Sequence, residues 1–282
     1  MGILIDCHLQ KEKLMTNKFS LLLFSTVPEL IPPAYHAGID GIIVDWENLG
    51  KENRQRSADT EINYFTVEDL RKVRQMTDTR VICRINGFGP HSAEEVENAI
   101  SAGADEILLP MVQSVSDVET VIRWVNQRCA VGILIETKAS VKDAQALSQL
   151  PLSRVYVGLN DLAIERKSAH IFSAIVDGTI EKIRPYFTNI PFGFGGLTLP
   201  DSGFPIPCRL LIGELMRLNC EMSFLRRAFQ ADIKGKNLKQ GVQDIQAALE
   251  DARSRSSEQI ERDKSELFDM IHLLERKGQG IQ

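Results

Sequence analysis

The stretch Ala37-Gly38-Ile39-Asp40-Gly41-Ile42-Ile43-Val44 recurs in kind as Ala102-Gly103-Ala104-Asp105-Glu106-Ile107-Leu108-Leu109. In both, the pattern predicts a helix that ends at glycine and is followed at once by a buried strand. Glycine suits a helix C-terminus because it has no Cβ atom to strain the left-handed backbone. The spacing of the two copies fits about two strand–helix units.

Strand-length apolar runs without helical periodicity occur eight times. They include or begin at Leu21, Gly41, Val81, Ile107, Val131, Val155, Pro191 and Cys220. Such runs suit parallel strands that are covered on both faces, and helical patterns lie between them. The alternation predicts an α/β fold, a (β/α)8 TIM barrel with extra C-terminal helices. An open doubly wound sheet is the alternative, but no glycine fingerprint follows the first strand.

Two of the helical patterns carry a possible start signal. Thr66 is followed by Asp69, and Ser116 is followed by Glu119, each pair with the spacing of a capping box. We expect the second pair to fit the box better, because glutamate is the usual partner.

The composition changes from about Ile233. Residues 237–277 are rich in Gln, Glu, Lys, Arg, Ala and Leu, and predict helices with a break around Ser254–Ser257. We therefore expect a barrel domain over residues 1–232 and a helical extension over 233–282. The extension is either a solvated tail or an oligomerisation arm whose apolar stripe needs a partner, and we expect a homo-oligomer.

Length, charge and cysteine usage exclude several classes of protein. The 282 residues carry a formal net charge of −5, so the basic surplus of a general nucleic-acid binder is missing. No apolar run approaches the roughly 18–20 residues that span a bilayer. The five cysteines form no C-x-x-C pair, which favours reduced thiols in a cytoplasmic protein over a zinc site. We expect neither nucleic-acid nor membrane partners.

Acidic residues follow two neighbouring strands of the predicted barrel. Glu136 and Asp161 would lie on strands about 4.8 Å apart, where two carboxylates repel each other unless a cation lies between them. A hard ion such as Mg²⁺ or Mn²⁺ takes one or two protein carboxylates and completes its shell with water and substrate oxygens. The alternative is that each carboxylate caps a helix or pairs with a nearby Lys or Arg.

Two further strand ends are candidates for substrate binding. Arg84 ends an apolar strand, and its planar fork suits either a substrate oxygen or a structural ion pair. Gly195 and Gly196 follow the seventh strand, where backbone N–H groups of such barrels often bind phosphate, although glycine clusters are also ordinary turns. The five histidines lie outside the strand ends, so a histidine base is not indicated.

Taken in order, these segments resemble the HpcH/HpaI aldolase and citrate lyase β-subunit family. The resemblance covers roughly residues 20–230 and rests on five stretches: Gly41–Asn48, Val81–Gly87, Gly103–Val112, Ile133–Thr137 and Val157–Leu162.

The resemblance implies a Mg²⁺- or Mn²⁺-dependent C–C bond lyase or aldolase that acts on a small 2-oxo acid or acyl-CoA thioester. It also implies that Glu136 and Asp161 ligate the metal and that Arg84 binds the substrate carbonyl or carboxylate. Such chemistry leaves an enolate, which a metal and an arginine stabilise. Asp45 and Glu47, in the D-x-E strand end, become candidates for substrate binding and catalysis.

The chain departs from the family pattern at Asn48, where aldolase-type members have His and citrate-lyase-type members have Asp. An amide cannot act as a general base at neutral pH, so proton transfer falls to another group, to water, or is absent. Two alternatives to a lyase follow: a metabolite-binding barrel without catalysis, and an acyl-CoA thioester hydrolase. The stretch Leu197–Cys208 also departs from the family and suggests a lid or substrate-specific loop.

Overall fold

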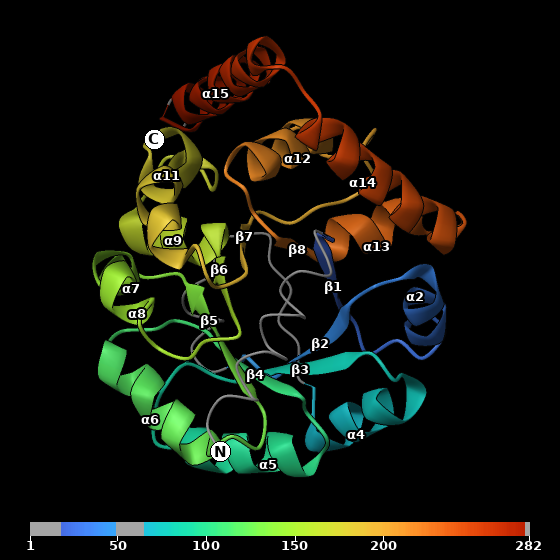
Figure 1. Cartoon of the computed structure of the whole chain (residues 1–282), viewed down its shortest axis with the longest axis vertical. Helices are drawn as coiled ribbons and strands as arrows, with labels where there is room; N and C mark the ends of the chain where they lie inside the picture. The colour runs from blue at the N-terminus through green and yellow to red at the C-terminus, as the bar shows by residue number, and fades with distance from the viewer. Residues whose placement is uncertain (1–17, 49–64, 280–282) are drawn as a thin grey trace, which may run out of the picture.

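The computed structural model describes residues 18–48 and 65–279. Its centre is one sheet of eight parallel strands in the order β7-β6-β5-β4-β3-β2-β1-β8. The strands are β1 (Ser20–Phe24), β2 (Gly41–Asp45), β3 (Arg80–Arg84), β4 (Glu106–Leu109), β5 (Ala130–Ile135), β6 (Arg154–Val157), β7 (Phe192–Phe194) and β8 (Met222–Leu225). Helices surround them in a ring (Figure 1), so the predicted TIM-barrel fold is confirmed.

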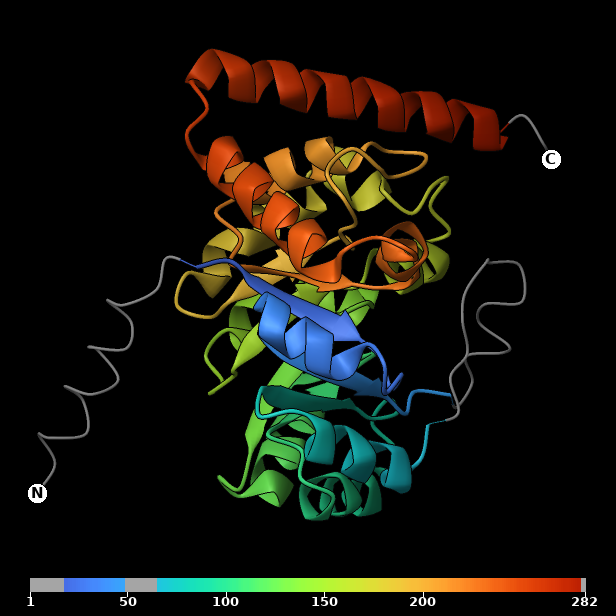
Figure 2. The same ribbon diagram turned by 90° about the vertical axis from the view of Figure 1, so that its right-hand side faces the viewer.

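The helices of the ring are mostly short. In chain order they are α2 (Ile31–Ala37), α4 (Val67–Met76), α5 (Ser92–Ser101), α6 (Val115–Val125), α7 (Lys138–Lys142), α8 (Ala144–Leu147), α9 (Leu159–Arg166), α10 (Ser173–Val176), α11 (Thr179–Ile183), the 3-10 turn η1 (Arg184–Phe187), α12 (Cys208–Arg217), α13 (Arg227–Ile233) and α14 (Leu238–Arg253). The last helix, α15 (Ser257–Gln279), lies outside the ring (Figures 1 and 2).

Of the two predicted capping boxes, one is present. The Asp69 amide donates to Thr66 Oγ1 and the Thr66 amide donates to the Asp69 carboxylate, and α4 begins there. The prediction at Ser116 was wrong: α6 begins two residues earlier, with Ser114 accepting from the Asp117 amide. Asp117 follows Ser114 with the spacing of a capping box, and the prediction overlooked this signal.

The barrel closes between β7 and β8 through an unusually close approach. The Glu221 amide donates to the Phe192 carbonyl at 3.0 Å, and the Leu197 amide donates to the Phe224 carbonyl at 2.9 Å. A Cβ atom at Gly193 would lie 2.0 Å from the Met222 carbonyl oxygen. Only glycine fits there, so this position lets the two outermost strands of the sheet meet.

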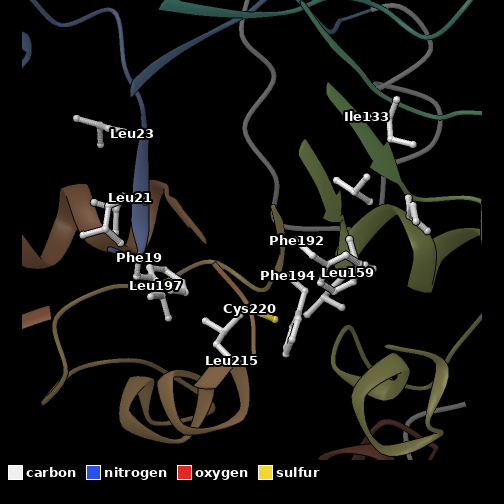
Figure 3. Close-up of a cluster of buried hydrophobic side chains, with 14 of the residues drawn as sticks. Phe19, Leu21, Leu23, Ile133, Leu159, Phe192, Phe194, Leu197, Leu215 and Cys220 are labelled. Carbon is white, nitrogen blue, oxygen red and sulfur yellow. The ribbon is translucent and has the colours of Figure 1, made fainter. Parts of the chain in front are cut away.

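Alternation along each strand divides the core into two layers. Leu21 and Leu23 point outward into the larger cluster under the helices, and Figure 3 shows them leaving β1 on the same side. Leu22 and Phe24 point into the barrel, where they meet the inward side chains of the other strands: Ile43, Ile82, Leu108, Leu134, Tyr156, Met222 and Phe224. Cys83 belongs to the outer layer, so it faces away from Arg84.

The two C-terminal helices differ in their packing. Helix α14 contacts α2 and α12 and buries Val242, Ile245 and Leu249, so it completes the ring after β8. Helix α15 packs on α10 and α12 of the same chain and buries Leu267 and Ile271 completely. The break between them falls at residues 254–256, as expected.

The division of the chain at residues 232 and 233 stays a prediction, although α14 of the expected extension lies in the barrel wall. The homo-oligomer also stays a prediction, which sedimentation of the purified chain would test. Because α15 buries its apolar stripe on its own chain, that stripe needs no second copy. None of the helices in the described residues combines the length and apolarity needed to cross a membrane.

At the amino ends of the strands, the barrel encloses a buried ion pair. Glu106 is fully buried; its Oε1 lies 2.5 Å from Arg154 Nε, and its Oε2 lies 2.8 Å from Arg154 Nη2. Arg80 and Ser153 donate to the same carboxylate at 3.0 and 2.8 Å. A Cβ atom at Gly132 would lie 2.7 Å from Glu106 Oε1, so this glycine makes room for the pair.

We predict that Glu106→Gln lowers the free energy of unfolding by about 3–5 kcal/mol, because it leaves the Arg154 charge buried without its counter-charge. Urea unfolding at neutral pH measures the change. Glu97→Gln is the control: its carboxylate is 58% exposed in an ion pair with Arg128, so we expect less than about 1 kcal/mol. Equal losses in the two variants would contradict the prediction.

The same pair predicts a dependence of stability on pH. Burial raises the pKa of Glu106, but the charge and hydrogen bonds of Arg154 and the charge of Arg80 outweigh it, so the pKa is lowered from its ordinary 4.5. The stabilisation is therefore complete above pH 4.5 and is lost as the pH falls through the folded-state pKa. Unfolding measured from neutral to acid pH should show a smaller loss of stability in Glu106→Gln than in the wild type.

Candidate active site

Alternation also decides which side chains reach the carboxyl end of the barrel. Arg80 and Ile82 point into the barrel from β3, so Arg84 does too; Gly132 and Leu134 point inward from β5, and Glu136 continues that series beyond the strand. The carboxyl ends of the strands in this fold are where active sites are built.

Arg84 is held by two acidic residues of the neighbouring strand. Its Nε and Nη2 donate to the two oxygens of Asp45 at 2.8 and 2.7 Å, and its Nη1 lies 3.1 Å from Glu47 Oε2. All three side chains are nearly inaccessible, at 1–2% exposure. Burial alone would lower the pKa of Arg84, but the charges of Asp45 and Glu47 raise it well above the ordinary value, so the guanidinium stays charged.

The structural ion pair that the sequence left open for Arg84 is therefore present. Asp45 pairs directly with Arg84 in the register of β2 and β3, which places both side chains on the same face. Asp45 and Glu47 do not line the pocket described below, whereas Arg84 does. Their contacts orient Arg84, and a direct role of either one in binding or catalysis stays a prediction.

Glu136 occupies space that only a glycine neighbour leaves open. A Cβ atom at Gly158 would lie 2.2 Å from Glu136 Oε1 and 2.5 Å from its Cγ. The Met111 amide donates to Glu136 Oε2 at 3.1 Å from a residue with a left-handed φ of 53°. Burial, and then repulsion from Asp161 and Glu47, raise the pKa of Glu136 to about 8. The carboxylates of the site therefore carry more negative charge than Arg84 neutralises.

Asp161 reaches the site from a helix rather than from a strand. We expected Asp161 to lie on the strand that includes Val155, but β6 ends at Val157 and Asp161 lies in the first turn of α9. The prediction was wrong because Gly158 ends the strand and takes the N-cap position, so Asp161 is not the cap. Its side chain is only 7% exposed and lines the same pocket as Glu136.

Asn48 is fixed through a chain of side-chain contacts. The backbone amide of Asn48 donates to Asn86 Oδ1 at 2.9 Å, and Asn86 Nδ2 donates to Glu95 Oε1 at 2.6 Å. Asn48 is half-buried and does not line the pocket. These contacts hold the backbone of Asn48 in place at the end of the described segment 18–48.

A pocket of about 650 Å³ opens over these residues. Its polar part contains Arg84, Glu136 and Asp161, with Gly195 and Gly196 beside them. The rest of the wall is largely apolar and includes Phe24, Tyr156, Leu159, Ile171, Phe172, Phe204, Ile206 and Leu211. Phe204 and Ile206 lie in the stretch predicted to form a lid or substrate-specific loop, and its position in the wall fits the second role.

Sequence reasoning missed three residues of this pocket. The rings of Phe24 and Tyr156 both contact Phe224, at centroid distances of 5.3 and 3.7 Å. Arg226 follows β8 directly, and its guanidinium lies 4.8 Å from the Phe24 ring centroid. A charged residue immediately after a predicted strand was a visible signal, as at Arg84, and it could have identified Arg226.

Comparison with known proteins agrees with this arrangement. The family model for HpcH/HpaI aldolase/citrate lyase matches residues 18–170, which is more than half of the chain. The chain therefore belongs to the HpcH/HpaI aldolase and citrate lyase family. None of the curated proteins compared with the chain matches it significantly.

Solved structures share the fold at low sequence identity. An HpcH/HpaI aldolase from Desulfitobacterium hafniense DCB-2 is 16% identical with a TM-score of 0.60, and the match covers 79% of this chain and 92% of that one. The citrate synthase SbnG is 15% identical with a TM-score of 0.59, over 79% and 92% of the two chains. At these identities the similarity shows the fold alone.

We predict that Gly158→Ala displaces the Glu136 carboxylate and lowers the affinity for Mn²⁺ by tenfold to about a hundredfold, the usual effect of disturbing a ligand's supporting contacts. Calorimetric titration with Mn²⁺ measures it. The added methyl group meets a side chain and not the backbone, so we expect the barrel to stay folded. Gly89→Ala, whose nearest neighbour would be 3.7 Å away, is the control. Unchanged Mn²⁺ affinity in Gly158→Ala would show that the position of Glu136 does not matter.

Proposed function

We propose that the chain is a divalent-metal-dependent C–C bond lyase or aldolase that acts on a small 2-oxo acid or acyl-CoA thioester through an enolate. The observation that carries this proposal is the buried pair of carboxylates, Glu136 and Asp161, beside a fixed guanidinium at the carboxyl end of the barrel. Membership of an aldolase and citrate lyase family supports it.

The two carboxylates fit a hard divalent ion such as Mg²⁺ or Mn²⁺. Both offer oxygen ligands. Burial, and then repulsion from Asp161, raise the pKa of Glu136, and a cation between the two carboxylates would relieve that repulsion. Within residues 18–48 and 65–279, no group of three or more His, Cys, Asp or Glu side chains is gathered for a metal. Water and substrate oxygens would complete the shell, as is usual for Mg²⁺. A bound ion would supply positive charge where the enolate oxygen develops its negative charge.

Arg84 would bind the carbonyl or carboxylate of the substrate. Asp45 and Glu47 fix its guanidinium before any substrate arrives, so no reorganisation is needed as charge develops. Gly195 and Gly196 line the same pocket, and because they have no side chains they would let a substrate approach the backbone closely. Both glycines are therefore proposed to bind substrate.

Proton transfer is the step that this chain must perform differently. Asn48 cannot take up a proton near neutral pH. We assign the proton to water, with Glu47 contributing through its contact with Arg84. A direct role of Asn48 in catalysis stays a prediction, because the residue does not line the pocket. The same asparagine favours a second candidate function, a barrel that binds a metabolite and does not turn it over.

The proposal predicts metal-dependent turnover. The purified chain is incubated with Mg²⁺ or Mn²⁺ and a panel of hydroxy-oxo acids and acyl-CoA compounds, and cleavage products are measured. We expect turnover that EDTA abolishes. Metal-dependent binding of pyruvate or oxalate without any turnover would instead support the non-catalytic barrel, and metal-independent release of free CoA would support a thioester hydrolase.

We further predict that Glu136→Gln weakens Mn²⁺ binding at least tenfold, because a neutral amide replaces one of two charged ligands. Calorimetry measures the affinity. Glu119→Gln, an exposed carboxylate on α6, makes the same chemical change away from the pocket and should have no effect. If both variants bind Mn²⁺ like the wild type, Glu136 is not a ligand.

We also propose that the protein works in a reducing compartment, the cytoplasm. The four cysteines within the described residues are free thiols, and Cys7 lies outside those residues. Burial raises the pKa of Cys208 to about 11 and that of Cys129 to about 11, so both stay protonated and unreactive at neutral pH.

A further inference from the structure

We propose that Glu275, on the last helix, is a positioning residue for the pocket. Through the Ser173 hydroxyl it fixes the turn that places Ile171 and Phe172 in the apolar wall. The inference goes beyond the proposed function, because it concerns how the wall is held and not which reaction occurs. It starts from a polar contact between α15 and α10 that the chemistry described above does not use.

The turn His170–Ser173 leads from α9 into α10 and carries two residues of the pocket wall. The Ser173 amide donates to the His170 carbonyl at 3.1 Å, and the His170 amide donates to Ser173 Oγ at 3.2 Å. Between these contacts stand Ile171 and Phe172, which both line the pocket. The Phe172 ring stacks on the His170 ring at a centroid distance of 5.4 Å. The positions of both wall side chains therefore depend on how well this turn is closed.

The Ser173 hydroxyl has one proton, and Glu275 of α15 receives it. Ser173 Oγ donates to Glu275 Oε1 at 2.6 Å, a distance typical of a hydroxyl bound to a carboxylate. A hydroxyl that donates in one direction keeps its lone pairs for another group, and the His170 amide takes that place. Ser173 is only 6% exposed. Glu275 therefore orients the hydroxyl so that it accepts a hydrogen bond from the turn.

Two histidines beside Glu275 fit the same arrangement. Glu275 Oε2 lies 3.2 Å from His272 Nδ1, so the carboxylate is also held by its own helix. Burial lowers the pKa of His170, and the charge of Glu275 opposes this only in part, so the His170 ring is neutral at neutral pH. A neutral ring can accept a hydrogen bond, and the Phe172 amide donates to His170 Nδ1 at 3.4 Å.

Helix α15 offers a fixed base from which Glu275 can act. It lies across the outside of the ring and packs on α10 and α12 (Figure 2). Just before the helix, Arg255 Nη2 donates to the Gly213 carbonyl of α12 at 2.6 Å. A Cβ atom at Gly213 would lie 2.7 Å from Arg255 Nη1, so the glycine makes room for this contact. Along the helix, Leu267 and Ile271 are completely buried. The carboxylate therefore reaches the turn from a helix that is docked along much of its length.

Hydrogen exchange tests the contact directly. Amide exchange of the full chain is followed by mass spectrometry on fragments that cover the turn, α12 and α15. Glu275→Ala removes the carboxylate, Glu275→Gln keeps an oxygen that can accept from the hydroxyl, and Ser173→Ala removes the hydroxyl. Glu261→Ala removes an exposed carboxylate from the same helix and is the control. Thermal unfolding checks that each variant is folded.

We expect Glu275→Ala to speed exchange in the turn by tenfold to about a hundredfold, the range for a hydrogen bond to a charged group, while α12 exchanges as in the wild type. Ser173→Ala should have at least as large an effect, and adding Glu275→Ala to it should change nothing further, because both remove one contact. Glu275→Gln should keep most of the protection and Glu261→Ala all of it.

Binding measures the consequence for the pocket. Calorimetry with Mn²⁺ compares pyruvate with phenylpyruvate, whose ring needs an apolar wall. We expect Glu275→Ala to weaken phenylpyruvate about threefold to tenfold, because a wall that moves covers less of the ring, and to leave pyruvate unchanged. Glu275→Gln should restore most of the difference. This second measurement uses the proposed function, whereas hydrogen exchange does not.

Three results would overturn the inference. The first is unchanged exchange of the turn in Glu275→Ala. The second is an equal increase in the turn and in α12, because Glu275 would then only help α15 to dock. The third is that the two acids are weakened equally, or that phenylpyruvate is not weakened at all. Failure of the proposed function looks different: neither acid binds to the wild type with Mn²⁺, and exchange in the turn then decides the inference by itself.

Discussion

The buried contact between Arg84 and Asp45 is the interaction on which the rest of the site depends. Removing charged groups from water costs several kcal/mol per ion, and only well-aligned partners offset this. The parallel register of β2 and β3 supplies that alignment, because it sets Asp45 directly beside Arg84 with both side chains pointing inward. Glu47 adds a second negative charge at 3.1 Å, so Arg84 has little freedom to move. The barrel thus presents a charge whose position is set by strand pairing and not by a mobile side chain.

Glycines, which have no side chain, matter to this barrel as much as its charged residues do. Two of the polar features inside the barrel lie beside a glycine whose Cβ atom would collide with them: Gly132 at the Glu106–Arg154 pair, and Gly158 at Glu136. Gly193 plays the same part for the barrel itself, where β7 and β8 approach each other. A closed barrel of this size fills its interior with side chains, so a glycine on a neighbouring strand or turn leaves room for a buried charged group.

The fold could be predicted from the sequence because the signal repeats. Each strand is a short apolar run covered on both faces, and eight such runs separated by helical patterns leave few architectures open. Arg84 and Glu136 could be predicted as site residues because each is a charged residue at the carboxyl end of an apolar strand, where the side chains of a barrel converge. Local starts and ends were harder. The start of α9 and the N-cap of α6 each lie within a few residues of the predicted position. Over such short distances several neighbouring residues offer similar start signals.

Contacts across the barrel could not be predicted, because no local pattern encodes them. Phe24 and Arg226 are far apart in the chain and meet only because β1 pairs with β8. Asp161 reaches the pocket from α9 because β6 ends before Gly158, which is the N-cap of the helix, and this places Asp161 in the first helical turn. Such contacts depend on how the sheet closes, which becomes visible only when the strand order is known.

The apolar wall of the pocket decides how strongly its charges act. Few large apolar side chains are well exposed in the described residues, and three of them, Val27, Ile171 and Phe204, line this pocket. A ligand that covers them displaces water from the mouth and lowers the local dielectric, which strengthens the attraction between opposite charges inside. It also makes an unneutralised carboxylate more costly. Enclosure of the substrate therefore favours the state in which Glu136 and Asp161 each have a partner of opposite charge.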